Sequence, residues 1–193
     1  MNDQLDAFPS RPVYPEGFFY QPELISTEEE RELVERISAL PFQEFRFQEY
    51  VGRRRVISFG WGYDFEENRL KPGEPIPELL LPALERAAGF AGVAVAEIPH
   101  VLVTEYGPGA AIGWHRDRAV FDKIIGLSLL SACTFRLRRR AGDRWERVSL
   151  EAHPRSAYVL SGPARTDWEH SIPPVPTTRY SITFRTLRKS RRR

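Results

Sequence analysis

The C-terminal half of this sequence is divided into short runs of strand-forming residues, and this pattern restricts the fold more than any other feature. Turn-forming residues such as Gly107-Pro-Gly109, Gly142-Asp143 and Gly162-Pro163 separate the runs. The runs lie at residues 100–106, 124–131, 133–138, 145–150, 156–160 and 179–186. Many short strands at close spacing are typical of a sandwich or barrel. We therefore expect residues 93–188 to form a double-sheet jelly roll.

The residues before this region favour helices and irregular segments. Residues 1–22 are rich in proline and predict an extended arm. Ser26 with Glu29, or Thr27 with Glu30, can form a capping box at the start of a helix. The pattern leaves both capping pairs open.

A second helix is expected at residues 77–88, closed by Gly89, after a loop at residues 68–75. Between the two helices, residues 42–65 interleave aromatic side chains with arginines, and their period of two indicates strands. The predicted fold class is α+β, mainly β: a double-stranded β-helix (jelly roll) with N-terminal helices, in a single domain of residues 1–193.

The length and composition favour one ordinary globular domain. The 193 residues are enough for a real core, and no apolar run approaches the roughly 20 residues of a membrane span. The N-terminus lacks the features of a signal peptide, and the single Cys133 allows no internal disulfide. We therefore expect a cytoplasmic protein with no membrane partner.

The charge is unevenly distributed along the chain. Residues 1–40 hold nine acids and three bases, a net charge of −6, so a total of +2 leaves 2 − (−6) = +8 for the remainder. Arginine clusters at residues 53–55 and 136–140 and the basic tail at residues 189–193 carry much of this excess. Such clusters suit a phosphate-binding surface. Solvated charge and an unstructured tail are the alternative.

Three residues form a candidate metal site. His115 and Asp117 are two apart, so on an extended strand both face the same side. His170 can supply a third ligand from a distant strand, and two histidines with one carboxylate are the ligands of non-haem Fe(II) oxygenases. Taken alone, the His-x-Asp pair is weak evidence for a metal site, because a polar pair at a strand end is usually solvated.

The segment Arg179-Tyr-Ser-Ile-Thr-Phe-Arg185 strengthens this interpretation. As a strand it places Arg179, Ser181, Thr183 and Arg185 on one face, and apolar residues on the other. Two buried arginines require an anion such as a dicarboxylate cosubstrate. The alternative is an edge strand with both arginines in solvent. Because six residues of strand span about 20 Å, we assign Arg179 to the far carboxylate and Arg185 to the metal end, close to the near carboxylate or to Asp117.

These segments resemble the AlkB family of Fe(II)/2-oxoglutarate-dependent dioxygenases. The resemblance rests on residues 102–117 (LVTEYGPGAAIGWHRD), Asp167-Trp-Glu-His170 and the Arg-x5-Arg strand, in that order. It implies that His115, Asp117 and His170 bind iron and, with Arg185, form the catalytic set. It implies further that 2-oxoglutarate is bound by Tyr106, Arg179 and Arg185, with Thr104 and Ser181 where the family often has asparagine.

The resemblance also implies the cofactors and a substrate class. Fe(II), 2-oxoglutarate and O2 would support oxidative demethylation of N-alkylated bases in DNA or RNA, as in DNA repair, with release of succinate, CO2 and an aldehyde. Residues 42–70 occupy the place of a hairpin lid for substrate recognition. There Trp61 and Tyr63 would stack on a base, and Arg53, Arg54 and Arg55 would contact phosphates. The alternative for these aromatics is a hairpin core.

One departure leaves the base preference open. Many nucleic-acid repair members have an acidic residue two positions after the aspartate ligand, where this chain has Ala119. Asp122 is a candidate replacement.

Three functions remain possible at this stage. The first is the demethylase acting on alkylated DNA or RNA, with no obligate protein partner. The second is an oxygenase of a protein side chain or small molecule, and the third is a non-catalytic nucleic-acid-binding module with a vestigial site.

Overall fold

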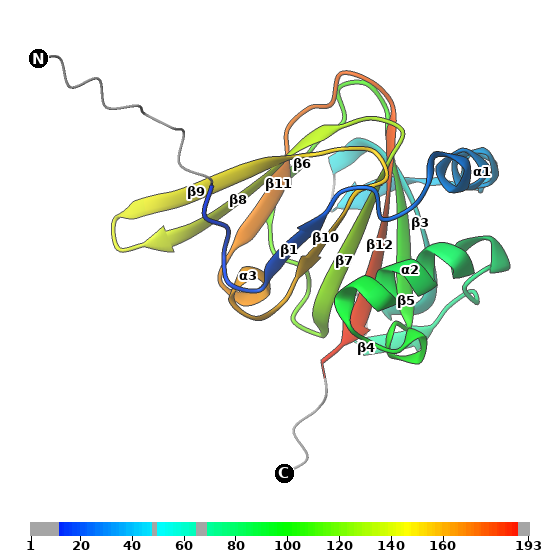
Figure 1. The fold of residues 1–193 in the computed structure, drawn as a ribbon, viewed down its shortest axis with the longest axis horizontal. Helices are drawn as coiled ribbons and strands as arrows, with labels where there is room; N and C mark the ends of the chain where they lie inside the picture. Colours follow the sequence, from blue (N-terminus) through cyan, green and yellow to red (C-terminus); the bar gives the residue numbers. More distant parts are fainter. Residues whose placement is uncertain (1–11, 48–49, 65–68, 189–193) are drawn as a thin grey trace, which may run out of the picture.

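Two antiparallel β-sheets pack against each other (Figure 1). The structure is a computed structural model that describes residues 12–47, 50–64 and 69–188. The major sheet follows the order β1 (Phe18–Gln21), β10 (Ala157–Leu160), β7 (Phe121–Leu129), β12 (Arg179–Leu187), β5 (His100–Tyr106), β3 (Tyr50–Asp64) and β2 (Gln43–Phe47), with β4 (Arg69–Pro72) paired to β3. The minor sheet follows the order β6 (Ile112–His115), β11 (Glu169–Ile172), β8 (Cys133–Ala141) and β9 (Arg144–Ala152). This mainly β jelly roll confirms the predicted fold class.

Helix α1 (Thr27–Ser38) begins at the first of the two predicted capping pairs. Ser26 Oγ accepts a hydrogen bond from the Glu29 amide at 3.1 Å, and Glu29 Oε2 accepts one from the Ser26 amide at 2.7 Å. This reciprocal pair satisfies two amides that a helix start leaves without internal partners. The helix buries Leu33 and Ile37 against the major sheet.

The second helical segment corrects a prediction. A 3-10 turn, η1 (Glu78–Leu80), leads into α2 (Leu81–Ala91), which continues through Gly89. The helix ends at Gly92, whose φ of 61° is the left-handed conformation that glycine adopts freely. A helix-interior glycine costs only about 1 kcal/mol, and α2 buries four residues around it, which are Ala83, Leu84, Ala87 and Ala88.

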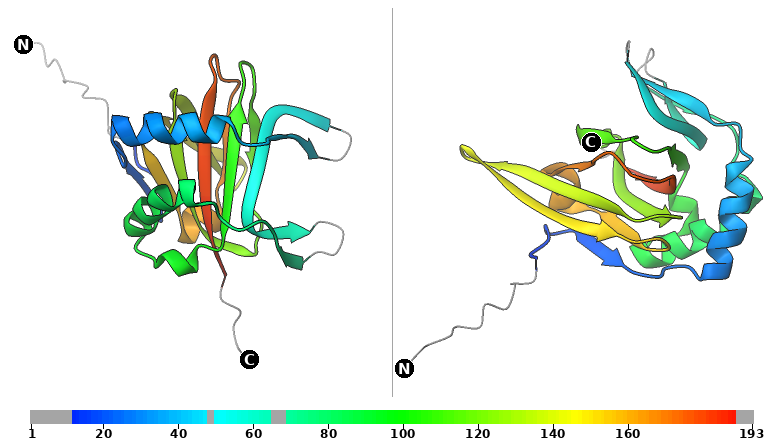
Figure 2. Two further views of the ribbon diagram at one scale, coloured as in Figure 1. Left: turned by 90° about the vertical axis from the view of Figure 1, so that its right-hand side faces the viewer. Right: turned by 90° about the horizontal axis from the view of Figure 1, so that it is seen from above.

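Helices α1 and α2 cover one face of the major sheet (Figure 2). The side chains between them form an outer cluster that includes Val101, Val103, Tyr180, Ile182 and Phe184. A second, inner cluster lies between the two sheets. The central strand β12 pairs with β5 on one side and β7 on the other, and therefore presents one face to each layer.

Several short elements differ from the expectations. Residues 18–21, within the expected arm, form β1 and pair with β10, because Phe18 is buried in the inner cluster. The expected loop at residues 68–75 contains β4. The short helix α3 (Gly162–Thr166) was not expected, whereas β6 and β11 are strands at His115 and His170, as the candidate metal site required. Strand β7 ends at Leu129 rather than residue 131, since Leu130 adopts a φ of 73°.

The major sheet also draws on residues outside the range 93–188, because β1 and β3 belong to it. Residues 1–11 of the expected arm and the basic tail at 189–193 lie outside the described residues. Within the described part of the chain, no helix has both the length and the apolar composition needed to cross a membrane.

Candidate metal and cosubstrate site

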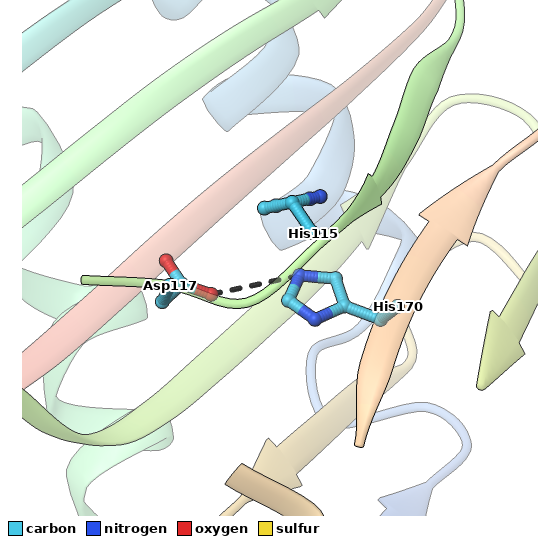
Figure 3. A group of neighbouring side chains, drawn as sticks. All are labelled: His115, Asp117 and His170. Atoms are coloured by element: carbon cyan, nitrogen blue, oxygen red, sulfur yellow. Dashed lines mark ion pairs between the residues drawn. The ribbon is translucent and has the colours of Figure 1, made fainter. Parts of the chain in front are cut away.

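His115, Asp117 and His170 converge between the two sheets (Figure 3). One ligand atom from each lies within 4.8 Å of the others. His115 ends β6, and His170 is its direct partner on the neighbouring strand β11, so their rings lie 4.2 Å apart. Asp117 follows β6 in a loop and points its Oδ2 atom at His170 Nε2, 3.5 Å away. Nitrogen and oxygen donors in this number and arrangement fit a divalent iron ion with open coordination positions.

The ring of His115 is oriented by its own backbone. Its Nδ1 atom lies 2.9 Å from the Gly113 carbonyl oxygen, a contact that assigns the proton to Nδ1. The other nitrogen, Nε2, is then left with a lone pair for a metal. A hydrogen bond from the ring nitrogen that does not bind the metal is the usual way in which proteins orient a histidine ligand.

The Asp117 carboxylate is held by Arg185. Both Nε and Nη2 of Arg185 donate to Asp117 Oδ1, at 2.9 and 2.8 Å. Burial alone would raise the pKa of Asp117, but the neighbouring Arg185 cation lowers it below the usual value. The carboxylate is therefore charged, as a metal ligand must be.

The histidines of the site are kept neutral. Burial, followed by the neighbouring His115, lowers the pKa of His170 to about 3 although Asp117 acts in the opposite direction. Burial also lowers the pKa of His115. Neutral imidazole is the form that binds metal ions.

Arg179 forms the opposite end of the same cavity. It is only 2% exposed, its guanidinium lies 4.7 Å from the Tyr106 ring centre, and its Nη2 donates to Ser128 Oγ at 2.6 Å. Its Nε and Nη1 atoms are buried and have no hydrogen-bond partner among the described residues. A buried guanidinium with unused donors is unfavourable without an anion. The unused Nε and Nη1 donors of Arg179 are therefore suited to bind a carboxylate at this end of the cavity.

The residues between these two ends continue a polar wall. Thr104 and Ser181 are direct cross-strand partners on β5 and β12, and both line the cavity with Thr183. Tyr106 is the partner of Arg179 in the same register. The structure thus shows the predicted alternation of β12, with its polar face toward the cavity and Tyr180, Ile182 and Phe184 in the outer cluster.

Two further cavity residues had no distinguishing signal in the sequence. Tyr158 on β10 lies across Gly126 on β7, where a Cβ atom would come within 2.3 Å of the tyrosine ring. Gly126 therefore provides the space that the Tyr158 ring occupies. Cys133, at the start of β8, lines the same region.

Arg165 supports the loop that carries Asp117. This α3 residue is 5% exposed, and its Nη2 atom donates to the carbonyl oxygens of Asp117, at 2.9 Å, Phe121, at 3.1 Å, and Arg118. Its partners are backbone atoms, so sequence patterns carry no signal for this role. The loop after β6 is therefore fixed by a buried cation behind the metal ligand.

The three arginines of β3 have different surroundings. Arg54 lines the cavity, where burial lowers its pKa and a hydrogen bond with Tyr106 acts in the opposite direction. Arg55 points to the other side of the sheet and forms a two-point ion pair with Glu105, with both contacts at 2.8 Å. Arg53 is exposed. Only Arg54 reaches the candidate site.

Of the remaining substrate candidates with described side chains, neither Trp61 nor Asp122 lines the cavity. Trp61 is 44% exposed near the end of β3, while the side chain of Tyr63 lies outside the described ones. Ala119 and Asp122 are both exposed, and neither lines the cavity.

Comparison with known proteins identifies the family. The model of the 2OG-Fe(II) oxygenase superfamily matches residues 17–185. A mouse protein named tRNA (carboxymethyluridine(34)-5-O)-methyltransferase ALKBH8 is 30% identical over 167 residues, covering 83% of this chain and 24% of its own length. An Arabidopsis thaliana protein named alkylated DNA repair protein ALKBH8 homolog is 28% identical over 184 residues, covering 81% of this chain and 51% of its own length. This chain thus spans about a quarter to a half of these relatives.

Solved structures agree on the fold. The structure of OsALKBH1 superposes with a TM-score of 0.64 over 91% of this chain and 99% of that one, at 15% identity. Fe(II), 2-oxoglutarate and O2 are the cofactor and cosubstrates of the matched superfamily, and the two ends of the cavity fit the first two. The chain belongs to the 2OG-Fe(II) oxygenase superfamily and, by its relatives, to the AlkB family of dioxygenases within it.

Proposed function

We propose that this dioxygenase oxidatively demethylates N-alkylated bases in DNA or RNA. One observation carries the nucleic-acid part: strand β3 directs Arg54 into the cavity and holds the exposed Trp61 on the same strand. A cation beside the site can bind a phosphate, and an exposed aromatic ring further along the same strand can stack on a base. The names of the two relatives, one concerning tRNA and one alkylated DNA, support this choice.

Each site residue has a defined task in this proposal. His115, Asp117 and His170 would hold iron on one side and leave the opposite side open. Arg179 would bind the distal carboxylate of 2-oxoglutarate through the donors that are otherwise unused. Together the bound groups supply the oxidising chemistry that side chains lack. Arg185 orients Asp117, so that Oδ2 remains available on the metal side.

Water exclusion is the contribution of the inner cluster. The Phe135 ring lies 5.5 Å from the His170 ring and is 1% exposed, so the buried side of the site is apolar. A hydroxyl group placed on an N-methyl carbon gives a hemiaminal, which breaks down to formaldehyde and the free base. The protein's part in this step is to position the methyl group and to keep bulk water away.

The decisive test measures two products together. Single-stranded DNA and RNA oligonucleotides containing 1-methyladenine or 3-methylcytosine are incubated with iron and 2-oxoglutarate, and formaldehyde and succinate are quantified. We expect equal amounts of both from at least one oligonucleotide. His115→Ala should abolish both products, whereas His153→Ala, a change at an exposed histidine outside the site, should not.

A second function is favoured by one observation. Position 119 is an exposed alanine and Asp122 does not line the cavity, so neither offers an acidic contact to a base there. A protein side chain or a small molecule would not need that contact. Succinate formation without formaldehyde from any methylated oligonucleotide would replace the proposed substrate class with this one.

A further inference from the structure

The minor sheet has an outer face that the proposed chemistry does not use. Strand alternation directs His115 and His170 inward, and their neighbours Trp114 and Glu169 outward. The other side chains of this outer face are Ser171 on β11, Thr134, Arg136, Arg138 and Arg140 on β8, and Trp145, Arg147, Ser149 and Glu151 on β9. Arg140 and Arg147 are exposed, and the remaining arginines and both tryptophans are half-buried. The face is therefore accessible to solvent.

Tryptophans and arginines alternate across this face. The Arg138 guanidinium lies between the rings of Trp114 and Trp145, at 4.4 and 4.2 Å from their centres. Arg136 lies 5.0 Å from the Trp114 ring, and Arg140 lies 5.5 Å from the Trp145 ring. Each cation–π contact restricts a flexible side chain. The charges are thus held in place before any ligand arrives.

The hydrogen bonds of the three β8 arginines share one feature. In each, the Nε atom is the donor: Arg136 to Ser171 Oγ at 3.0 Å, Arg138 to Glu169 Oε2 at 2.7 Å, and Arg140 to the Gly142 carbonyl at 3.0 Å. These three bonds use the inner nitrogen of each guanidinium and not its terminal nitrogens. Terminal guanidinium nitrogens are the groups that bind phosphate oxygens in pairs.

The charge of the face is unbalanced. Four arginines share it with two acids, Glu151 and Glu169, which leaves a net positive charge. Arg138 and Arg147 stand directly opposite each other on β8 and β9, and like charges in that position repel. An extended polyanion lying on the face would remove this repulsion.

We propose that this outer face binds the phosphodiester backbone of the single-stranded nucleic acid whose base enters the active site. The proposal rests on the proposed function and names the surface that holds its substrate. A row of cations interleaved with aromatic rings is the arrangement that binds single strands without sequence preference. Strands β6 and β11 carry the iron ligands on their inner side, and β6 is an edge of the minor sheet, so a nucleic acid held outside would pass around β6 for its base to reach the site.

The test removes charge from this face and leaves the Arg138–Glu169 pair intact. The variant combines Arg136→Gln, Arg140→Gln and Arg147→Gln. Its matched control combines Arg31→Gln, Arg36→Gln and Arg139→Gln, which remove three exposed or half-buried charges from α1 and from the opposite side of β8. Binding of a labelled, unmodified single-stranded oligonucleotide is measured by fluorescence anisotropy from 50 mM to 500 mM salt.

We expect the control to match the wild-type protein. The logarithm of the binding constant falls linearly with the logarithm of the salt concentration, and each lost phosphate contact on a single strand reduces the steepness of this line, the salt slope, by about 0.7. The triple variant should therefore have a salt slope smaller by about 2. Its affinity at 0.1 M salt should be about 100-fold lower. The single variants Arg140→Gln and Arg147→Gln, at exposed positions, should each lose about 0.7 and serve if the triple variant does not fold. Turnover of a methylated nucleoside, which has no phosphodiester chain, should be unchanged.

Two results would overturn the proposal. One is an equal salt slope for the variants and the control, and the other is a wild-type protein that binds no oligonucleotide. Failure of the proposed function gives a different result, in which the wild-type protein binds with the expected slope but releases no formaldehyde from any methylated base.

Discussion

Arg185 binds one oxygen of the Asp117 carboxylate and leaves the other oxygen to face His170. The two contacts of Arg185 to Oδ1 measure 2.9 and 2.8 Å, and Oδ2 lies 3.5 Å from His170 Nε2. One carboxylate oxygen, Oδ1, therefore binds the Arg185 cation, and the other, Oδ2, faces the metal position. It remains charged at the site although its side chain is only 7% exposed.

Replacing Arg185 should weaken metal binding in a pH-dependent way. In Arg185→Gln the cation that lowers the Asp117 pKa is lost, so this pKa rises and protons compete with the metal at higher pH. We expect a 10- to 100-fold loss of affinity, growing as the pH falls from 7 to 5. Binding of Co(II) or Mn(II), followed by absorbance or electron paramagnetic resonance, measures it. An equal loss at both pH values would contradict this account.

Arg179 should be needed for the cosubstrate and not for the fold. Arg179→Met removes a buried guanidinium whose Nε and Nη1 have no partner among the described residues. The free energy of unfolding without ligand should therefore stay the same or rise. The KM for 2-oxoglutarate should increase about 10- to 100-fold, since hydrogen bonds to charged groups contribute about 1.5–3 kcal/mol. Thermal unfolding with and without 2-oxoglutarate separates the two effects.

Arg165 should act on metal affinity without contacting the metal. Its Nη2 atom donates to three carbonyl groups of the loop that carries Asp117, and the nitrogen of a lysine, one bond closer to the backbone, would not extend as far. We expect Arg165→Lys to reduce metal affinity by about 10-fold or more while Arg179 still binds 2-oxoglutarate. Arg116→Lys is the control, because exposed Arg116 joins the same loop to α3 through a single bond to Thr166.

His100 should make the metal-free protein less stable in acid. Burial, then the neighbouring Arg185, lowers its pKa to about 3, and Arg185 Nη1 lies 3.3 Å from its Nδ1. Between pH 3 and 6.5 the unfolded chain binds a proton that the folded chain does not, so stability falls as the pH falls through this window. The contribution is about 1.4 kcal/mol per pH unit below 6.5.

His100→Asn should remove the part of the pH dependence of folding stability that His100 causes. Asn keeps an acceptor for Arg185 and does not titrate. Urea unfolding of chelator-treated protein at pH 7.5, 6.5 and 5.5 measures the difference. The free energies of unfolding of the wild-type protein and the variant should differ by a constant amount above pH 7. Below pH 6.5 that of the wild-type protein should fall faster.

The parts of the site that depend on strand alternation could be predicted from the sequence. The segment from Arg179 to Arg185 has strict period two, and the structure places its polar side chains in the cavity and its apolar ones under the helices. The predicted separation of the two arginines also follows from strand length, since Arg185 meets Asp117 and Arg179 lies at the other end.

Other parts depend on contacts between distant segments. Strands β6 and β11 have four residues each and carry polar site residues, so they show no apolar periodicity. Arg165 acts through backbone carbonyls, which every residue possesses. The predicted end of α2 at Gly89 was wrong because burial of the surrounding alanines offsets the small cost of a helical glycine.

The direct pairing of His115 with His170 links metal binding to correct folding. A slip of one residue in β6 relative to β11 would turn His115 outward and bring Trp114 inside, while β11, held by β8, keeps His170 inward. Such a misaligned chain could not bind iron. Because a ligand that binds only one arrangement increases its population, iron present during folding would select the native alignment of the minor sheet, and metal content in a preparation would report the fraction of correctly paired molecules.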